Sequence, residues 1–205
     1  GLVGSEMCIR DSRRIKLHAT FSCFEKFQRG NEYRFLVING EVIGVLQRIP
    51  AHVIGDGNQT IEKLIDQKNT HPLRGTDYNK PLQKIQIDES LLHHLQERKL
   101  ALDYIPKQNQ VIQLRKNSNI STGGDSIDMT DQIPLRFKNI AIEATKQLNV
   151  AICGVDMIIE DYQNEASNYA IIEMNQNPAI HIHAYPLIGK GQEVGQAILK
   201  ALRFI

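Results

Sequence analysis

The sequence predicts an α+β fold, because strand-like and helix-like segments follow one another without a strict βαβ rhythm. The 205 residues fit one large domain or two small lobes, and an apolar fraction of 41% supports a sizeable core. Strands are indicated by short apolar runs near turn residues, and helices by apolar residues at helical spacing. The chain contains no internal repeat and no low-complexity tract.

A β-hairpin is the clearest element. Segments 33–38 and 41–49 flank Asn39-Gly40, the dipeptide that best tolerates the positive φ angles of a type I′ turn. Further strands are expected at 111–116, 152–159 and 169–175, with a polar connection between the last two.

Four helices are expected, each with an apolar side. Thr60 caps a short one that runs to Gln67, and Pro134 begins a longer one. Residues 68–89 are polar and contain proline, so they are expected to form a loop. The other apolar stripes are Leu91, Leu92 and Leu95 in 90–100; Phe137, Ile140, Ala141, Ala144 and Leu148; and Val194, Ala197, Ile198, Ala201 and Leu202 near the end.

Charge and cysteine content narrow the class of protein. The net charge is +1 and the 24 basic residues are scattered, which argues against nucleic-acid or membrane binding by bulk electrostatics. No apolar run approaches the roughly 18 residues of a membrane span. Cys8, Cys23 and Cys153 are widely spaced and form no CxxC pair, so a cytoplasmic, reducing location is expected.

The first twelve residues, GLVGSEMCIRDS, do not fit the rest of the chain. They lack the basic region and the cleavage pattern of a signal peptide. We expect residues 1–12 to be a non-native start and residues 13–205 to form the domain.

The strongest local motif is Glu173-Met174-Asn175. On a strand, Glu173 and Asn175 share one face while Met174 points into the core. Asp156 lies within the apolar stretch CGVDMII, where a lone carboxylate is costly unless it is paired or bound to metal. If the two strands are neighbours, three oxygen ligands suited to Mg²⁺ converge. The alternative, that each acid pairs with a nearby Lys or Arg, remains equally open at this point.

A second motif is Arg115 followed by residues 117–126, NSNISTGGDS. Gly123 and Gly124 permit close backbone approach, and Ser121, Thr122 and the amide groups can hold an oxyanion. Arg115 adds a positive charge suited to phosphate or carboxylate. The alternative is an ordinary Ser/Thr/Gly turn. The GxxxxGK[ST] spacing of a phosphate-binding P-loop is absent.

Two weaker candidates remain. Glu25 and Glu32 could accept hydrogen bonds from a ribose or an adenine amine, although on sequence alone solvated surface charges are the better explanation. His181 and His183 lie at same-face spacing for a strand, with Cys153 as a conceivable third zinc ligand. A hydrogen-bonded structural role is the better interpretation for the histidines. No pattern supports nucleophilic catalysis.

Taken in order, these segments resemble the ATP-grasp module of bacterial bifunctional glutamate–cysteine ligase/glutathione synthetases, over about residues 22–203. Cyanophycin synthetase shares most of this framework, whereas DSIDMTD and NPAIHIH look more like the glutathione enzymes. The segments that carry the resemblance are EKFQRGNEYRFLVING (25–40), RIPAHVIGDGNQTIEKLI (48–65), KNTHPLRGTDYNKPLQKI (68–85), LRKNSNISTGGDSIDMTD (114–131), CGVDMII (153–159) and IIEMNQNPAIHIHAYP (171–186).

The resemblance implies a partial ATP-grasp fold: hinge strands, part of the central lobe and the C-terminal lobe. It places Glu25 and Phe27 at the hinge near adenine and Glu32 at the ribose. It makes Asp156, Glu173 and Asn175 ligands of two Mg²⁺ (or Mn²⁺) ions, with Glu173 shared between them. It places Arg115 and Arg48 in the reaction zone as catalytic cations. The loop that faces the γ-phosphate and the acceptor carboxylate would comprise Asn117, Asn119, Ser121, Thr122, Gly123 and Gly124.

The implied reaction joins glycine to γ-glutamylcysteine at the expense of ATP, through an acyl phosphate, to give glutathione. The alternatives are a cyanophycin synthetase-like ligase that adds Asp or Arg to poly-aspartate, and a non-catalytic ATP-grasp remnant. The family's upstream lobe lies before the matched segment, so this missing part of the polypeptide is an expected partner and the isolated chain is expected to be nearly inactive. The oligomeric state stays open.

Overall fold

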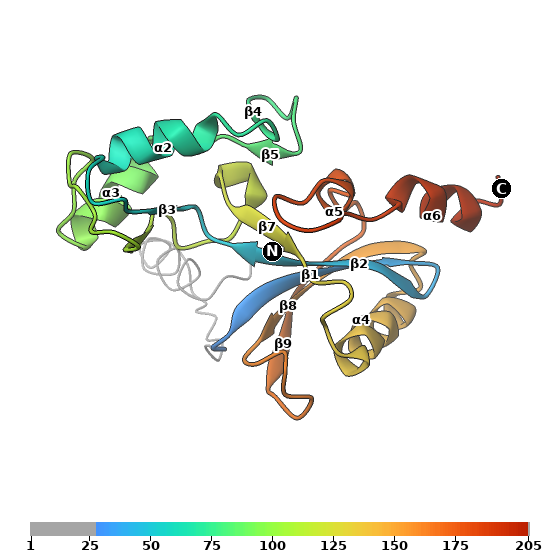
Figure 1. Ribbon diagram of the computed structural model, residues 1–205. Helices are drawn as coiled ribbons and strands as arrows, with labels where there is room; N and C mark the ends of the chain where they lie inside the picture. The colour runs from blue at the N-terminus through green and yellow to red at the C-terminus, as the bar shows by residue number, and fades with distance from the viewer. Residues whose placement is uncertain (1–27, 205) are drawn as a thin grey trace, which may run out of the picture.

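The computed structural model describes residues 28–204 (Figure 1). The expected non-native start at 1–12 and the hinge candidates Glu25 and Phe27 lie outside the described residues. In the part that is described, no helix is both long and apolar enough to cross a membrane.

The predicted hairpin forms the centre of the structure. Strands β1 (Asn31–Ile38) and β2 (Glu41–Ile49) pair antiparallel. Asn39 has a φ of 47° and Gly40 a φ of 80°, the positive values that a type I′ turn requires. The turn prediction is confirmed.

Five strands form the main sheet, in the order β7-β2-β1-β8-β9. The added strands are β7 (Asp125–Asp128), β8 (Ile152–Ile159) and β9 (Tyr169–Asn175), and every pairing between neighbours is antiparallel. β8 and β9 match the predicted ranges residue for residue. An antiparallel sheet with separate helices confirms the α+β class.

The two faces of this sheet have different coverings. Helix α4 (Leu135–Leu148) packs on one face, whereas α5 (His181–Ala184) and α6 (Val194–Ala201) lie on the other (Figure 1). Because side chains alternate along a strand, Arg34 and Leu36 on β1 and Asp156 on β8 face away from α4. The core under α4 includes Tyr33, Phe35, Val37, Val45, Phe137, Ala141, Cys153, Val155 and Met157.

A smaller lobe is inserted between β2 and β7, at the upper left of Figure 1. Its helices are α2 (Ile61–Asn69) and α3 (Glu89–Glu97), and the hydroxyl of Thr60 caps α2 as predicted. Its short strands are β3 (His52–Ile54), β4 (Arg74–Gly75), β5 (Leu82–Gln83) and β6 (Val111–Gln113). The lobe has its own core of Ala51, Val53, Ile61, Leu64, Ile65, Ile85, Leu91, Leu95, Ile112 and Leu114.

Several sequence expectations need correction. Leu92 is 44% exposed, because α3 directs Leu91 and Leu95 inward instead. β3, β4, β5 and β7 were not predicted, since strands of two to four residues carry too little periodicity. His181 and His183 lie on the short helix α5, where a spacing of two residues separates faces: His181 is exposed and His183 is buried.

Candidate active site

The face of the sheet opposite α4 gathers the acidic residues that the sequence singled out. Asp156 on β8 lies directly opposite Glu173 on β9, and Asn175 lies opposite Gly154, two residues before Asp156. Residues opposite one another on neighbouring strands project to the same face. The structure therefore brings the three proposed metal ligands together on one face.

Two arginines hold the carboxylate of Asp156. Arg34 lies opposite it on β1 and donates from Nε to Oδ1 and from Nη2 to Oδ2, each at 2.6 Å. Arg48 donates from Nη2 to Oδ2 at 2.7 Å. Asp156 is fully buried, so these charge-assisted hydrogen bonds offset the cost of removing the charge from water. Asp156 is therefore paired with nearby arginines, as the alternative to metal binding predicted.

The ion-pair network extends to Glu32. Arg48 lies opposite Glu32 on the paired strands, and its guanidinium bridges the carboxylates of Glu32 and Asp156. Ser118 donates its hydroxyl proton to Glu32. Glu32 is therefore held inside a network and is not a solvated surface charge.

Glu173 differs from Asp156 in its surroundings. Its side chain is exposed, and its negative charge contributes to raising the pKa of Arg34. Burial lowers that pKa, but the hydrogen bond and charge of Asp156, together with Glu173, outweigh burial and raise it overall. Asn175 Oδ1 accepts from the amide of Asn177 at 3.0 Å and keeps a second lone pair. An exposed carboxylate beside an amide oxygen suits a hard cation.

The donor set is small. Within residues 28–204, no group of three or more His, Cys, Asp and Glu side chains is placed to hold a metal. The proposed trio contains two carboxylates and one amide. Such a set fits Mg²⁺, which usually binds through one or two carboxylates and completes its shell with water and phosphate.

The Gly-rich turn precedes β7, the strand beside Arg48. Its centre is the 3₁₀ turn η1 (Ile120–Thr122). The amides of Thr122 and Gly124 donate to the carbonyl of Asn119, and that of Gly123 donates to Ile120. These three amides close the turn and are not free to hold an oxyanion, contrary to the expectation of an amide cradle. The exposed side chains of Asn119 and Ser121 remain available.

Close packing explains the Gly pair. A Cβ on Gly123 would lie 2.6 Å from Cγ1 of Ile85, and one on Gly124 would lie 2.8 Å from the carbonyl oxygen of Asn119. Gly123 also has a φ of 93°. The turn is thus pressed between the small lobe and its own backbone.

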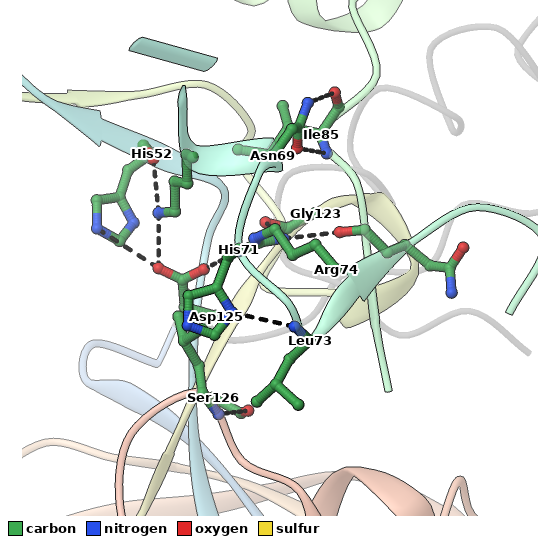
Figure 2. Close-up of polar contacts among 12 residues, drawn as sticks. His52, Asn69, His71, Leu73, Arg74, Ile85, Gly123, Asp125 and Ser126 are labelled. Carbon is green, nitrogen blue, oxygen red and sulfur yellow. Dashed lines mark hydrogen bonds and ion pairs between the residues drawn. The ribbon is translucent and has the colours of Figure 1, made fainter. Parts of the chain in front are cut away.

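A buried ionic cluster fixes this turn to the small lobe (Figure 2). Arg74 donates to the carbonyl of Gly123 at 3.1 Å and forms an ion pair with Asp125, the first residue of β7. Lys68 contacts the same carboxylate at 2.7 Å and donates to the carbonyl of His52 at 2.8 Å. This cluster was not predicted, because its members are scattered over the sequence.

Arg115 is not brought to Asp156. Its guanidinium donates to Asp88 Oδ2 at 2.7 Å and to the carbonyl of Gln86 at 3.1 Å. Asp88 also caps α3 by accepting from the amide of Leu91. In this structure Arg115 therefore anchors the start of α3 within the small lobe.

The segment after β9 crosses back over the site face. A Cβ on Gly154 would lie 2.9 Å from Cβ of Pro178, and a Cβ on Gly44 would lie 3.0 Å from Nδ1 of His183. Gly154 and Gly44 both lie opposite Leu36, on either side of β1. Because Gly154 and Gly44 have no side chains, this segment packs closely against the sheet beside the ion pairs.

His183 is buried without a hydrogen-bond partner for either ring nitrogen, contrary to the expected hydrogen-bonded role. Burial, together with the positive charge of Arg34, lowers its pKa from 6.5 to about 3, so the ring is neutral at neutral pH.

Comparison with known proteins identifies relatives over most of the chain. The glutathione biosynthesis bifunctional protein of Desulfotalea psychrophila is 46% identical over 189 residues, which is 91% of this chain and 24% of that protein. The protein of the same name from Clostridium perfringens is 50% identical over 180 residues, or 87% of this chain and 23% of that protein. The crystal structure of a bifunctional glutathione synthetase from Pasteurella multocida matches with a TM-score of 0.76 and 42% identity, covering 88% of this chain and 25% of that one.

The chain belongs to the ATP-grasp module of the bifunctional glutathione biosynthesis proteins. It spans about a quarter of the length of these relatives (24% and 23%). A scan against protein-family models found no match.

Sequence reasoning missed two residues that contact the candidate site, Arg34 and Ser118. Arg34 interrupts the apolar run of β1, just as Asp156 interrupts that of β8, so the cost of burying a charge would have indicated it. Ser118 lies within the Gly-rich segment and had no distinguishing signal of its own.

Proposed function

We propose that the chain is the metal-binding part of an ATP-dependent carboxylate–amine ligase that joins glycine to γ-glutamylcysteine to give glutathione. The observation that supports this most directly is the register of β8 and β9, which sets Asp156 opposite Glu173 with Asn175 on the same face. Relatives named for glutathione biosynthesis, similar over 87–91% of the chain, support the choice of substrate.

Asp156, Glu173 and Asn175 would hold Mg²⁺ or Mn²⁺ in this proposal, with Glu173 shared between two ions. When bound, the metal supplies positive charge at the phosphate oxygens of ATP. The chain's own contribution is to fix three oxygen donors on rigid neighbouring strands, so that little reorganisation is required.

The reaction begins when the C-terminal carboxylate of γ-glutamylcysteine attacks the γ-phosphorus of ATP. A carboxylate oxygen–phosphorus bond forms, the β–γ bridge breaks, and ADP leaves. The glycine amine then attacks the acyl carbon, loses a proton and expels inorganic phosphate. Two anions must meet in the first step, so cations dominate catalysis. Arg48, which borders both Glu32 and Asp156, is the cation best placed to face the developing charge.

The Gly-rich loop would meet the acceptor carboxylate through side chains, with Asn117, Asn119 and Ser121 as donors. Thr122 would join them by exchanging its hydrogen bond to Asn117 Oδ1 for the substrate. Gly123 and Gly124 would contribute by letting the loop pack closely. Glu32 would meet the ribose, and Glu25 and Phe27 the adenine. Arg115 remains a candidate at the reaction zone, provided that it exchanges its contact with Asp88 for a substrate anion.

This chain covers 24% of the length of the Desulfotalea psychrophila protein. In a protein of that length, the additional residues would complete the nucleotide site. We therefore expect the 205-residue chain alone to bind ATP weakly and to turn over little. Robust glutathione formation by the isolated chain would contradict this.

The test compares substrates. The chain, extended to the length of its relatives, is incubated with ATP, Mg²⁺, γ-glutamylcysteine and glycine, and ADP and glutathione are measured. ADP release that requires both γ-glutamylcysteine and glycine is expected. Release that instead requires poly-aspartate with Asp or Arg would support the cyanophycin-type alternative, and no release with either set would support a non-catalytic remnant.

A further inference from the structure

Arg34 makes the most extensive contact with Asp156 among the described residues. Its planar guanidinium grips both carboxylate oxygens through two parallel hydrogen bonds of 2.6 Å. Such a two-point contact fixes the rotation of the carboxylate as well as its position. The side chain of Arg34 is 10% exposed and that of Asp156 is 1% exposed, so water competes weakly for the pair.

Arg48 contacts the same carboxylate differently. It reaches Oδ2 through one nitrogen, Nη2, and that nitrogen is shared with Glu32. A single shared contact constrains the carboxylate less than a two-point contact. Glu32 offers Arg48 an alternative partner if its contact with Asp156 is lost.

The strand order separates Arg34 from the proposed metal position. β8 lies between β1 and β9, so Arg34 approaches Asp156 from one side while Glu173 lies on the other. A carboxylate offers about four lone-pair positions. Arg34 and Arg48 occupy three of them, two on Oδ2 and one on Oδ1. If Arg48 withdrew, a cation between Asp156 and Glu173 would have a second lone-pair position available on the Asp156 carboxylate.

We propose that Arg34 is a positioning residue that orients Asp156 for the metal, and that Arg48 is the cation that metal binding displaces from Asp156. This inference rests on the proposed function, because it takes Asp156 as a metal ligand. It assigns opposite roles to two arginines that contact one carboxylate.

The experiment measures Mn²⁺ binding to the 205-residue chain without nucleotide. Mn²⁺ broadens nearby amide resonances, so the amides of 154–156 and 173–175 report binding at this site. Arg34→Lys keeps the charge but loses the two-point contact, and Arg34→Gln loses both. Arg48→Lys and Arg48→Gln are the matched controls on the same carboxylate.

A positioning role predicts that both Arg34 variants bind Mn²⁺ more weakly, by about tenfold or more, as for other partners that orient metal ligands. Arg48→Gln is expected to bind more tightly than the unaltered chain, by about threefold or more, because a repelling charge is removed. Arg48→Lys is expected to bind as the unaltered chain does. If charge alone mattered, Arg34→Gln would also bind more tightly.

Unchanged binding in Arg34→Lys, or tighter binding in Arg34→Gln, would overturn the role of Arg34 alone. Weaker or equal binding in Arg48→Gln would overturn the displacement of Arg48. If the unaltered chain shows no Mn²⁺ broadening at these amides, the metal site fails, and the proposed function fails with it. Failure of the arginine roles therefore shows in the variants alone, whereas failure of the proposed function shows in the unaltered chain.

A measurement on the unaltered chain covers the case in which an Arg34 variant does not fold. Hydrogen exchange of the Arg34 Nε–H is followed by NMR as Mg²⁺ is added. Exchange that stays slow at saturating Mg²⁺ is expected, because Arg34 keeps its contact. Exchange that rises to the rate of a solvated arginine would mean that Mg²⁺ displaces Arg34, which contradicts the proposal.

Discussion

Arg34 and Asp156 lie opposite one another on β1 and β8 and share two hydrogen bonds of 2.6 Å, although 122 residues separate them in the sequence. This pair sets the orientation of the carboxylate at the centre of the site face. Glu173, on the far side of β8, completes a row of three charged residues across three strands, one basic and two acidic.

Replacing Glu173 tests the proposed metal site through nucleotide binding. Glu173→Gln keeps the shape but removes the charge that a hard cation requires. In the chain extended to the length of its relatives, we expect the Mg²⁺-dependent part of ADP affinity to fall about tenfold or more, an energy of about 1.4 kcal/mol. Isothermal calorimetry with Mg²⁺ and with chelator measures it. Glu143→Gln, an exposed change on α4, is the control, and equal affinities in both variants would revive the non-catalytic alternative.

The start of α3 offers a stability test of the contact between Arg115 and Asp88. Thr60 and Asp88 both cap helices of nine residues, but Asp88 also binds Arg115. Thr60→Ala is expected to lower the free energy of unfolding by about 1 kcal/mol. Asp88→Ala should cost more, because the buried Arg115 loses its carboxylate partner and keeps, among the described residues, only the carbonyl of Gln86. Urea unfolding measures both, and equal costs would show that the ion pair contributes nothing.

The close packing at Gly154 predicts a steric effect of substitution, and Gly195 provides a matched control. A methyl group on Gly154 would lie 2.9 Å from Cβ of Pro178, whereas one on Gly195 in α6 meets nothing within 4 Å. Gly154→Ala should lower the free energy of unfolding by about 1–3 kcal/mol. Gly195→Ala should raise it by about 0.5–1 kcal/mol, since alanine favours the helix. A harmless Gly154→Ala would mean that the segment after β9 does not rest on the sheet.

His183 predicts a loss of stability in acid. Its pKa is about 3 in the folded chain and 6.5 in the unfolded one, so between these values the unfolded chain binds more protons. Stability is therefore retained above pH 6.5 and falls as the pH drops toward 3. At pH 5 the loss is about 2 kcal/mol. Denaturant unfolding at several pH values measures it.

The control for this pH effect is the neighbouring histidine. His183→Asn should remove most of the loss between pH 7 and 5, whatever its effect on stability at neutral pH, whereas His181→Asn should leave the loss intact because His181 is exposed. An unchanged slope in His183→Asn would show that other groups cause the loss.

The sequence predicted the elements of this site better than their contacts. Alternation along a strand was enough to put Glu173 and Asn175 on one face, and β8 and β9 occur at the predicted residues. The partner of Asp156 could not be predicted in the same way. Arg34 meets it through the order and register of the sheet, which depend on distant parts of the chain.

The Gly-rich segment shows the limit of local reasoning. Arg115 precedes the turn in sequence, which favoured a joint role, yet Asp88 binds its guanidinium. The arginine that does reach the turn is Arg74, 49 residues before Gly123. The position of Arg74 depends on how the small lobe packs against β7. That packing cannot be predicted from a local sequence pattern.

The most direct test of the metal site is a crystal structure of the chain, extended to the length of its relatives, with Mn²⁺ and ADP. Anomalous diffraction locates Mn²⁺ without assumptions about the ligands. We predict a peak at coordination distance, about 2.1 Å, from the side-chain oxygens of Asp156, Glu173 and Asn175. A peak bound to the nucleotide but distant from all three side chains would contradict the account.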